Sequence, residues 1–358
     1  MTSEMRALII QKTLENMSSE PLEIALDAQI KLIDPQNADL AELHRNLIEE
    51  IDGYGPITSL LKNQNVTEIL IDSPSEIYVE ESGNLQKANL SFTNSQTLNR
   101  FIKNLLREID RTADQRHPLV DGTLADGSRV HIALPPVTSL PVISIRRHSK
   151  LDWSLKDLSL KGMFSESLLQ KLQSKINQRA NILICGATGC GKTTLLRSMI
   201  NEIPKSERVL TIEDTSELSL TRPNSVSLLT RISLEGLFPS INLSDLLKNA
   251  LRMRPDRLVV GEMRSEEALV FLDAVSTGHT GSMSSIHGSS ATQALSRLEH
   301  LVSRGALQWS MESIRKLIYE GIDLVIGVER KNGNRQIHEV VELAGLEPFG
   351  YLLEPWVI

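Results

Sequence analysis

The sequence contains only two cysteines, Cys185 and Cys190, close together in one stretch of the chain. Two cysteines so placed do not indicate a disulfide framework, and neither has the companions that a zinc site needs. No run of about 18 consecutive apolar residues occurs, so the sequence predicts no membrane-spanning helix. Low-complexity tracts and internal repeats are also absent. These absences favour a globular protein whose thiols stay reduced, as in the cytosol.

Positive charge is not in excess either. The chain has 38 Lys and Arg against 45 Asp and Glu, a formal net charge of −7 and a pI near 5.7. A general nucleic-acid coat holds phosphate backbones with clustered Lys and Arg, so we expect no nucleic-acid partner. The first residues carry an apolar stretch too short and too acidic for a signal peptide. We therefore expect a cytoplasmic location.

The length of 358 residues exceeds the usual size of one domain and predicts two. Residues 1–50 have a helical pattern, and residues 51–147 read as strands and turns around one helix, which predicts a small α+β domain. Residues 148–160 are polar enough for a linker. In residues 161–358 strands and helices alternate, so we predict an α/β fold with a parallel sheet.

Local patterns refine this outline. An apolar stripe in the first segment is expected to pack in a core; its members are Leu40, Leu43, Leu47, Ile48 and Ile51. Asp121-Gly122 and Asp126-Gly127 are predicted hairpin-type turns in the α+β domain. Asn332-Gly333 predicts a further hairpin, added to the sheet of the α/β domain.

The most informative motif is a Gly-x-x-x-x-Gly-Lys-Thr sequence at residues 186–193. An apolar run suited to a buried strand precedes it, and apolar residues at helical spacing follow. In such a loop the glycines let backbone N–H groups face phosphates, Lys192 reaches the β/γ oxygens and Thr193 ligates Mg²⁺. The sequence therefore predicts binding of a nucleoside triphosphate with Mg²⁺. The predicted binding residues are Gly186, Ala187, Thr188, Gly189, Cys190, Gly191, Lys192, Thr193 and Thr194.

Two acidic positions follow predicted strands at the edge where open α/β sheets bind ligands. Glu213-Asp214 follows one strand and Glu262 follows another. A carboxylate there can orient or deprotonate the attacking water, or hold a water on Mg²⁺. The usual second nucleotide motif ends in Asp and a following acid, but Gly261 stands at the first of those positions. We therefore expect Mg²⁺ to rely on Thr193, the phosphates and a water held by Glu262.

Two histidines, His279 and His287, bracket a glycine-rich stretch around a further predicted strand. A histidine that follows a strand beside the loop can sense the γ-phosphate through a hydrogen bond made in one nucleotide state only. A lone histidine is otherwise more often a satisfied core residue. Their neighbours do not suggest metal ligation.

Four ordered motifs together resemble the type II/type IV secretion and pilus ATPases. They are the phosphate loop, an "Asp box" at 211–214, an atypical second motif at 254–264 and a "His box" at 277–287. The amino-terminal half also agrees, at 53–57, 66–69, 126–130 and 143–147. The resemblance covers roughly residues 45–345, and it looks most similar to the CpaF group, which serves tight-adherence pili.

This resemblance implies a homohexameric ring. Each subunit would join an amino-terminal, PAS-like α+β domain to a RecA-like P-loop ATPase core, with ATP and Mg²⁺ bound between them. The implied activity is ATP hydrolysis that powers pilus assembly or protein secretion, by a cytoplasmic protein associated peripherally with the inner membrane and its platform protein. The family branch with a four-cysteine zinc element is excluded, because no cysteine follows Cys190.

The resemblance also assigns roles to residues outside the loop. It implies that Glu213 and Glu262 activate water and position the metal, and that His287 contacts the γ-phosphate, with His279 the weaker candidate. The implied γ-phosphate arginines of the amino-terminal domain are Arg129 and Arg146, with Arg147 adjacent. A guanidinium suits this role because it neutralises charge that develops on the transferred phosphoryl group.

Three other functions remain open. The VirB-type conjugation and effector-export ATPases share the same motifs, so the client of the motor is undecided. A nucleotide-gated scaffold would bind ATP without hydrolysing it. A DNA translocase is disfavoured by the acidic balance of the chain.

Overall fold

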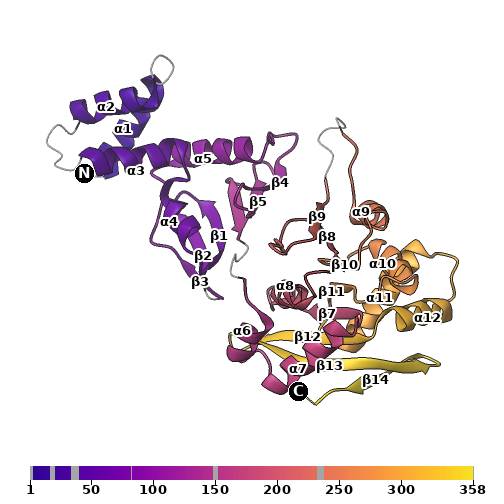
Figure 1. Ribbon diagram of the computed structural model, residues 1–358. Helices are drawn as coiled ribbons and strands as arrows, with labels where there is room; N and C mark the ends of the chain where they lie inside the picture. The colour runs from indigo at the N-terminus through magenta and orange to yellow at the C-terminus, as the bar shows by residue number, and fades with distance from the viewer. Residues whose placement is uncertain are drawn as a thin grey trace. The chain divides into compact units, whose positions relative to one another are not determined.

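The computed structural model describes residues 3–16, 21–33, 40–81, 83–147, 152–231 and 238–357. The chain divides into two compact units, Met1–Lys150 and Leu151–Ile358. Each unit has its own sheet and its own buried core (Figure 1). Among the described residues, no helix combines the length and the apolar composition needed to cross a bilayer.

The first unit begins with helices and continues into an antiparallel sheet. Its described helices are α1 (Ser3–Asn16), α2 (Leu22–Ile33), α3 (Leu40–Asp52), the 3-10 helix η1 (Gly55–Ile57), α4 (Thr58–Lys62) and α5 (Ser95–Glu108). Its strands are β1 (Val66–Ser73), β2 (Glu76–Glu81), β3 (Asn84–Lys87), β4 (Leu119–Thr123), β5 (Arg129–Ala133) and β6 (Val142–Arg146). The six strands lie in the order β3-β2-β1-β6-β5-β4. Every neighbouring pair is antiparallel, which confirms the predicted α+β character.

Helix α5 supplies the apolar layer that covers this sheet. Asn94 begins the helix with a capping box, in which its side chain accepts hydrogen bonds from the N–H groups of Gln96 and Thr97. Phe101 and Leu105 of α5 are buried in the same core as the inward side chains of β1 and β6. The predicted stripe of α3 packs in a smaller core with α1 and α2, although the side chain of Leu40 lies outside the described ones.

One predicted turn of this unit is confirmed and one is wrong. Asp126-Gly127 lies between β4 and β5, where Gly127 has a left-handed φ of 90°. Asp121-Gly122 instead lies inside β4, with Gly122 opposite Val130 of β5. A Cβ at Gly122 would come within 2.5 Å of Ile109 at the end of α5. The glycine therefore allows β4 and the end of α5 to approach each other closely.

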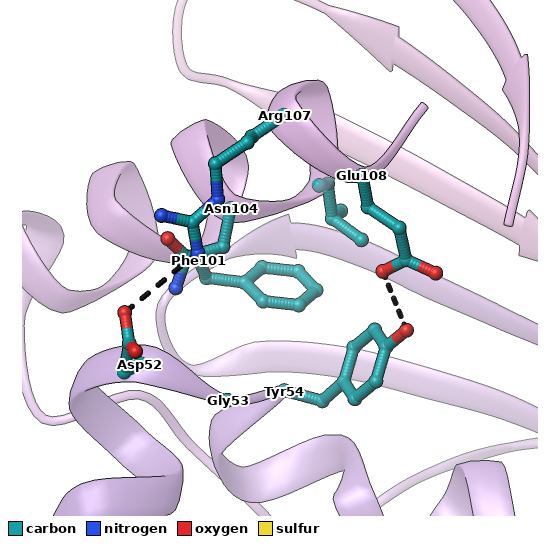
Figure 2. A pocket seen from close by; sticks show the side chains of 8 residues that line it. Asp52, Gly53, Tyr54, Phe101, Asn104, Arg107 and Glu108 are labelled. Atoms are coloured by element: carbon teal, nitrogen blue, oxygen red, sulfur yellow. Dashed lines mark hydrogen bonds and ion pairs between the residues drawn. The ribbon is translucent and has the colours of Figure 1, made fainter. Parts of the chain in front are cut away.

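A pocket of about 270 Å³ lies in the first unit, between the end of α3 and helix α5. It is lined by Asp52, Gly53, Tyr54, Phe101, Asn104, Leu105, Arg107 and Glu108. The hydroxyl of Tyr54 donates to Glu108 at 2.6 Å, and Arg107 lies 3.8 Å from Asp52. Figure 2 shows both contacts. Glu108 also accepts from the N–H of Ala125, at the start of the turn before β5. These contacts join the 53–57 segment to α5, so this segment has a structural role.

The second unit contains an eight-stranded sheet in the order β14-β13-β12-β7-β11-β10-β8-β9. Its strands are β7 (Ile182–Gly186), β8 (Val209–Glu213), β9 (Ser225–Leu229), β10 (Arg257–Val260), β11 (Met283–His287), β12 (Leu324–Lys331), β13 (Asn334–Glu347) and β14 (Gly350–Pro355). In this order, every neighbouring pair in the part β12-β7-β11-β10-β8-β9 is parallel. Strands β13 and β14 extend the sheet beyond β12 by antiparallel pairing. The sheet thus agrees with the predicted parallel α/β core.

Helices cover both faces of this sheet. They are α6 (Leu155–Leu160), α7 (Glu166–Asn177), α8 (Lys192–Glu202), α9 (Leu243–Ala250), α10 (Glu267–Ser276), α11 (Ala291–Gly305) and α12 (Met311–Gly321). The central strand β7 contributes Leu183 and Cys185 to the core shared with α9–α12, and Ile182 and Ile184 to the core shared with α6–α8. A strand buried on both faces is apolar throughout, which explains the continuous apolar run before the loop.

Part of the predicted linker at 148–160 is an ordered helix. Residues 148–151 lie outside the described residues, but Ser154 begins α6 with a capping box to Asp157. Leu155 and Leu158 are buried in the core of the second unit. The polar residues that favour a linker in the sequence therefore include a helix cap.

Candidate active site

The phosphate loop connects the carboxyl end of β7 to the amino end of α8. Gly189 and Gly191 have φ values of 74° and 105°, in the left-handed region that glycine adopts without strain. A Cβ on Gly186 would come within 2.3 Å of the carbonyl oxygen of Val328 and within 2.5 Å of the Cys190 sulfur. The loop therefore needs its glycines, and it leads into the amino end of α8, where the helix dipole favours an anion.

The two functional side chains of the motif lie at this loop. Lys192 is buried, and its ammonium group donates to the carbonyl oxygens of Gly186 at 2.8 Å and Ala187 at 2.9 Å. The hydroxyl of Thr193 donates to the carboxylate of Glu217 at 3.0 Å. Oxygen ligands of this kind are the ones that Mg²⁺ prefers, so this pair fits the predicted metal. Sequence reasoning did not select Glu217, whose only signal is its place in the acidic segment after β8.

Glu213 ends β8 as a buried carboxylate. Its Oε1 accepts hydrogen bonds from the N–H groups of Glu217 at 3.0 Å and Leu218 at 2.9 Å. Strands β8 and β10 pair in parallel, which brings Gly261 beside Glu213. A Cβ on Gly261 would lie 3.1 Å from the Cγ of Glu213. Gly261 thus leaves room for the Glu213 side chain, and this is a physical reason for the unusual second motif.

Replacing Gly261 by Asp is expected to lower the free energy of unfolding by about 1–3 kcal/mol, the usual cost of overfilling a packed site. A second carboxylate beside buried Glu213 adds charge repulsion to the steric cost. Urea unfolding measures the change. Gly350→Asp is the matched control, because a Cβ at Gly350 meets nothing within 4 Å. Equal stability of Gly261→Asp and the wild type would contradict this account.

Glu262 lies at the centre of a chain of charged side chains. His287 Nε2 is 2.7 Å from Glu262 Oε1, and Arg264 donates to Glu262 Oε2 through Nη2 at 2.5 Å and Nε at 3.0 Å. Arg264 also reaches Asp214 at 3.4 Å. Arg264 therefore holds Oε2 of Glu262, while the buried Oε1 faces His287 and accepts no hydrogen bond from the described residues. A fixed carboxylate at a strand end can orient water or take its proton.

His287 ends β11 directly opposite Gly186, the first residue of the phosphate loop. Burial lowers the pKa of His287 below its ordinary value of 6.5; Glu262 opposes this shift, while the charge of Lys192 adds to it. The imidazole is therefore mainly neutral at neutral pH. A neutral histidine keeps one N–H donor and one acceptor, so it can join Glu262 to a further group in the site.

His279 lies near the amino end of β11, at the end of the strand opposite to His287. It precedes β11, whereas His287 is the last residue of that strand, and β11 runs parallel to β7. The ring of His279 lies 3.0 Å from the carbonyl oxygen of Ala274, near the end of α10. His279 thus lies just past the end of α10 and remote from the phosphate loop.

Arg129 and Arg146 lie directly opposite each other on β5 and β6, so their side chains share one face of the first sheet. Arg146 also lies opposite Glu68 of β1. The adjacent Arg147 differs, because its guanidinium donates to the carbonyl oxygens of Leu60, at 3.1 Å, and Asn63, at the end of α4. Arg147 therefore holds the fold of the first unit, and the other two arginines form the pair that the sequence selected.

Comparisons with known proteins extend these observations. The family model described as "Type II/IV secretion system protein" matches residues 50–326. Conjugal transfer protein TrbB of Rhizobium radiobacter is 32% identical over 317 residues, which cover 87% of this chain and 94% of TrbB. Type IV secretion system protein VirB11 of Bartonella henselae is 32% identical over 325 residues, covering 80% of this chain and 90% of VirB11.

Among solved structures, the ATPase DotB of Legionella pneumophila superposes with a TM-score of 0.56 at 23% identity, covering 78% of each chain. This likeness supports the predicted α/β fold with a RecA-like core. The prediction of the secretion family is confirmed by the family model and by these relatives, which do not single out the tight-adherence group. The chain belongs to the type II/IV secretion system protein family.

Proposed function

We propose that this chain is an ATP hydrolase that powers a type IV secretion or conjugation machine. The observation that carries the proposal is the register of β7 and β11, which places His287, and with it Glu262, beside the first residue of a complete phosphate loop. A phosphate-binding loop and an oriented carboxylate are the parts that phosphoryl transfer to water requires.

The client is proposed from the relatives. TrbB and VirB11 are named for conjugal transfer and for type IV secretion, and they match over most of the chain. They support the VirB-type alternative better than the tight-adherence pilus that the sequence motifs suggested first. We further propose that the protein acts as a homohexamer at the cytoplasmic face of the inner membrane, bound peripherally to a platform protein.

In the proposed mechanism each side chain has a separate task. Lys192 and the N–H groups of the loop bind the phosphates. Mg²⁺, when bound, neutralises charge on the β- and γ-phosphates; Thr193 would hold it, with Glu217 or Glu262 acting through water. Glu262 orients the attacking water, Arg264 keeps its carboxylate in place, and His287 lies beside it. Buried Glu213 shapes the segment that carries Glu217.

Arg129 and Arg146 are proposed to stabilise the charge that develops on the γ-phosphoryl group. Arg129→Ala is expected to slow hydrolysis by about 10³-fold or more, the effect typical of such an arginine. Affinity for ATP should change only a few-fold, because the contact strengthens in the transition state. Phosphate release and nucleotide titration measure the two quantities, with the exposed Arg116→Ala as control. Equal losses of rate and affinity would contradict the role.

The function as a whole is tested in cells that lack this chain. We expect the loss of conjugative DNA transfer or of effector export, restored by the wild type and not by Glu262→Gln. Restoration by Glu262→Gln would instead indicate a nucleotide-gated scaffold. A defect confined to pilus assembly would overturn the proposed client and favour the tight-adherence pilus.

A further inference from the structure

The hairpin of β12 and β13 extends past the phosphate loop. Val328 of β12 pairs with Gly186, the first loop residue, and β12 continues for three residues beyond this point, to Lys331. The chain then turns at Asn332-Gly333, both with left-handed φ, and returns as β13. Because β12 and β7 are parallel neighbours, the tip of this hairpin lies beside the loop that we propose to bind phosphates.

Arg335, the second residue of β13, contacts this loop directly. Its Nε donates to the carbonyl oxygen of Gly189 at 3.4 Å. A Cβ on Gly191 would lie 3.0 Å from the Cδ and 3.8 Å from the Nε of Arg335. The hydrogen bond is long, hence weak, and the Arg335 side chain is exposed. The fold therefore does not depend on this arginine, although its guanidinium is held next to the loop.

Cations are concentrated at the hairpin tip. Arg330 lies opposite Arg335 in the β12–β13 pairing, and Lys331 follows Arg330. The nearby carboxylate of Glu329 accepts a hydrogen bond from Gln336 at 2.6 Å. Two arginines on one face of a hairpin repel each other, and an anion beside them removes that cost. Guanidinium groups are suited to phosphate because they donate two parallel hydrogen bonds.

We propose that Arg335 is a nucleotide-binding residue whose guanidinium contacts the α- and β-phosphates. In loops of this type the backbone N–H groups cradle these two phosphates, and Arg335 lies against the loop backbone at Gly191. The contact is made equally with ATP and ADP, so it contributes to affinity and not to the chemical step. This inference rests on the proposed function, because it requires nucleotide in the loop.

The test is calorimetric titration of the purified full chain with Mg-ATP and, separately, with Mg-ADP. Arg335→Ala is expected to raise the dissociation constants of both nucleotides about tenfold or more, the loss typical of a charge-assisted hydrogen bond. Arg335→Gln, which keeps a polar side chain without the charge, should show the same loss. Arg335→Lys should recover part of the affinity, since it restores the charge without the fork.

Lys331→Ala is the matched control. It removes the same charge from the same tip, but consecutive strand residues face opposite sides, so Lys331 faces away from the side shared by Arg330 and Arg335. Its nucleotide affinity should stay within about twofold of the wild type. A loss as large as that of Arg335→Ala would overturn the inference and indicate a general charge effect.

The remaining outcomes separate this inference from the proposed function. Unchanged affinities in Arg335→Ala, with normal binding by the wild type, would overturn the inference alone. A loss for ATP without a loss for ADP would overturn it too, because the contact would then be with the γ-phosphate. Failure of the wild type to bind either nucleotide would remove the proposed function itself.

Discussion

Replacing Lys192 by alanine is expected to abolish ATP hydrolysis while the chain stays folded. The ammonium group of Lys192 is buried against the carbonyl oxygens of Gly186 and Ala187, at the point where phosphates would enter the loop. Its removal leaves the phosphate charge without its main cationic partner. We expect the rate of hydrolysis to fall by about 10³-fold or more, the upper range for loss of a single electrostatic donor.

Phosphate release by the purified chain measures this loss. The exposed Lys205→Ala removes an equal charge from the same unit and should hydrolyse ATP at the rate of the wild type. Circular dichroism and urea unfolding show whether both variants remain folded. The strand β7 and helix α8 do not depend on the ammonium group, so their signals should persist. A folded Lys192→Ala variant with a near-normal rate would refute the assignment of the loop.

Replacing Glu262 by glutamine is the second large effect that we expect. The substitution keeps the shape of the side chain and removes the charge and basicity of its carboxylate, which Arg264 holds in place beside His287. Loss of a positioned general base lowers a rate typically by 10²–10⁴-fold, and we expect a decrease of about that size. ATP affinity should change little, because Glu262 acts on water and not on the phosphates.

Single-turnover phosphate release and nucleotide titration separate these two quantities. Glu266→Gln is the matched control, since Glu266 is exposed and lies only four residues further along the chain. It should leave both rate and affinity unchanged. If hydrolysis by Glu262→Gln equals that of the wild type, the catalytic role of this carboxylate is wrong and another group must orient the water.

The sequence predicts the core of the second unit well because its signals are local. A strand buried on both faces is a continuous apolar run, as in β7, and the loop after it follows a fixed glycine spacing. Glu213 and Glu262 are predicted as site residues for the same reason, since each follows such a run. Gly261, which departs from the usual motif, is different, because its contact with Glu213 depends on the pairing of β8 with β10.

Contacts between distant segments were not predicted. Arg335 lies at the loop only because β12 and β7 pair in a particular register, and a single sequence does not show register. Strand β9 lies at the edge of the sheet and is only partly buried, so it has no apolar run to reveal it. Asp121-Gly122 predicts a turn from its residue types alone. The approach of Ile109 to Gly122 depends on packing between the end of α5 and β4, which the sequence does not show.

Binding of Mg-ATP to the purified wild-type chain tests the central claim most directly. Calorimetric titration should show saturable binding at one site per chain, with a dissociation constant in the range of roughly 1 μM to 1 mM that is common for enzyme substrates. The Lys192→Ala variant should bind at least about tenfold more weakly. Folded wild-type protein that shows no affinity for adenine nucleotides in the presence of Mg²⁺ would contradict the whole account.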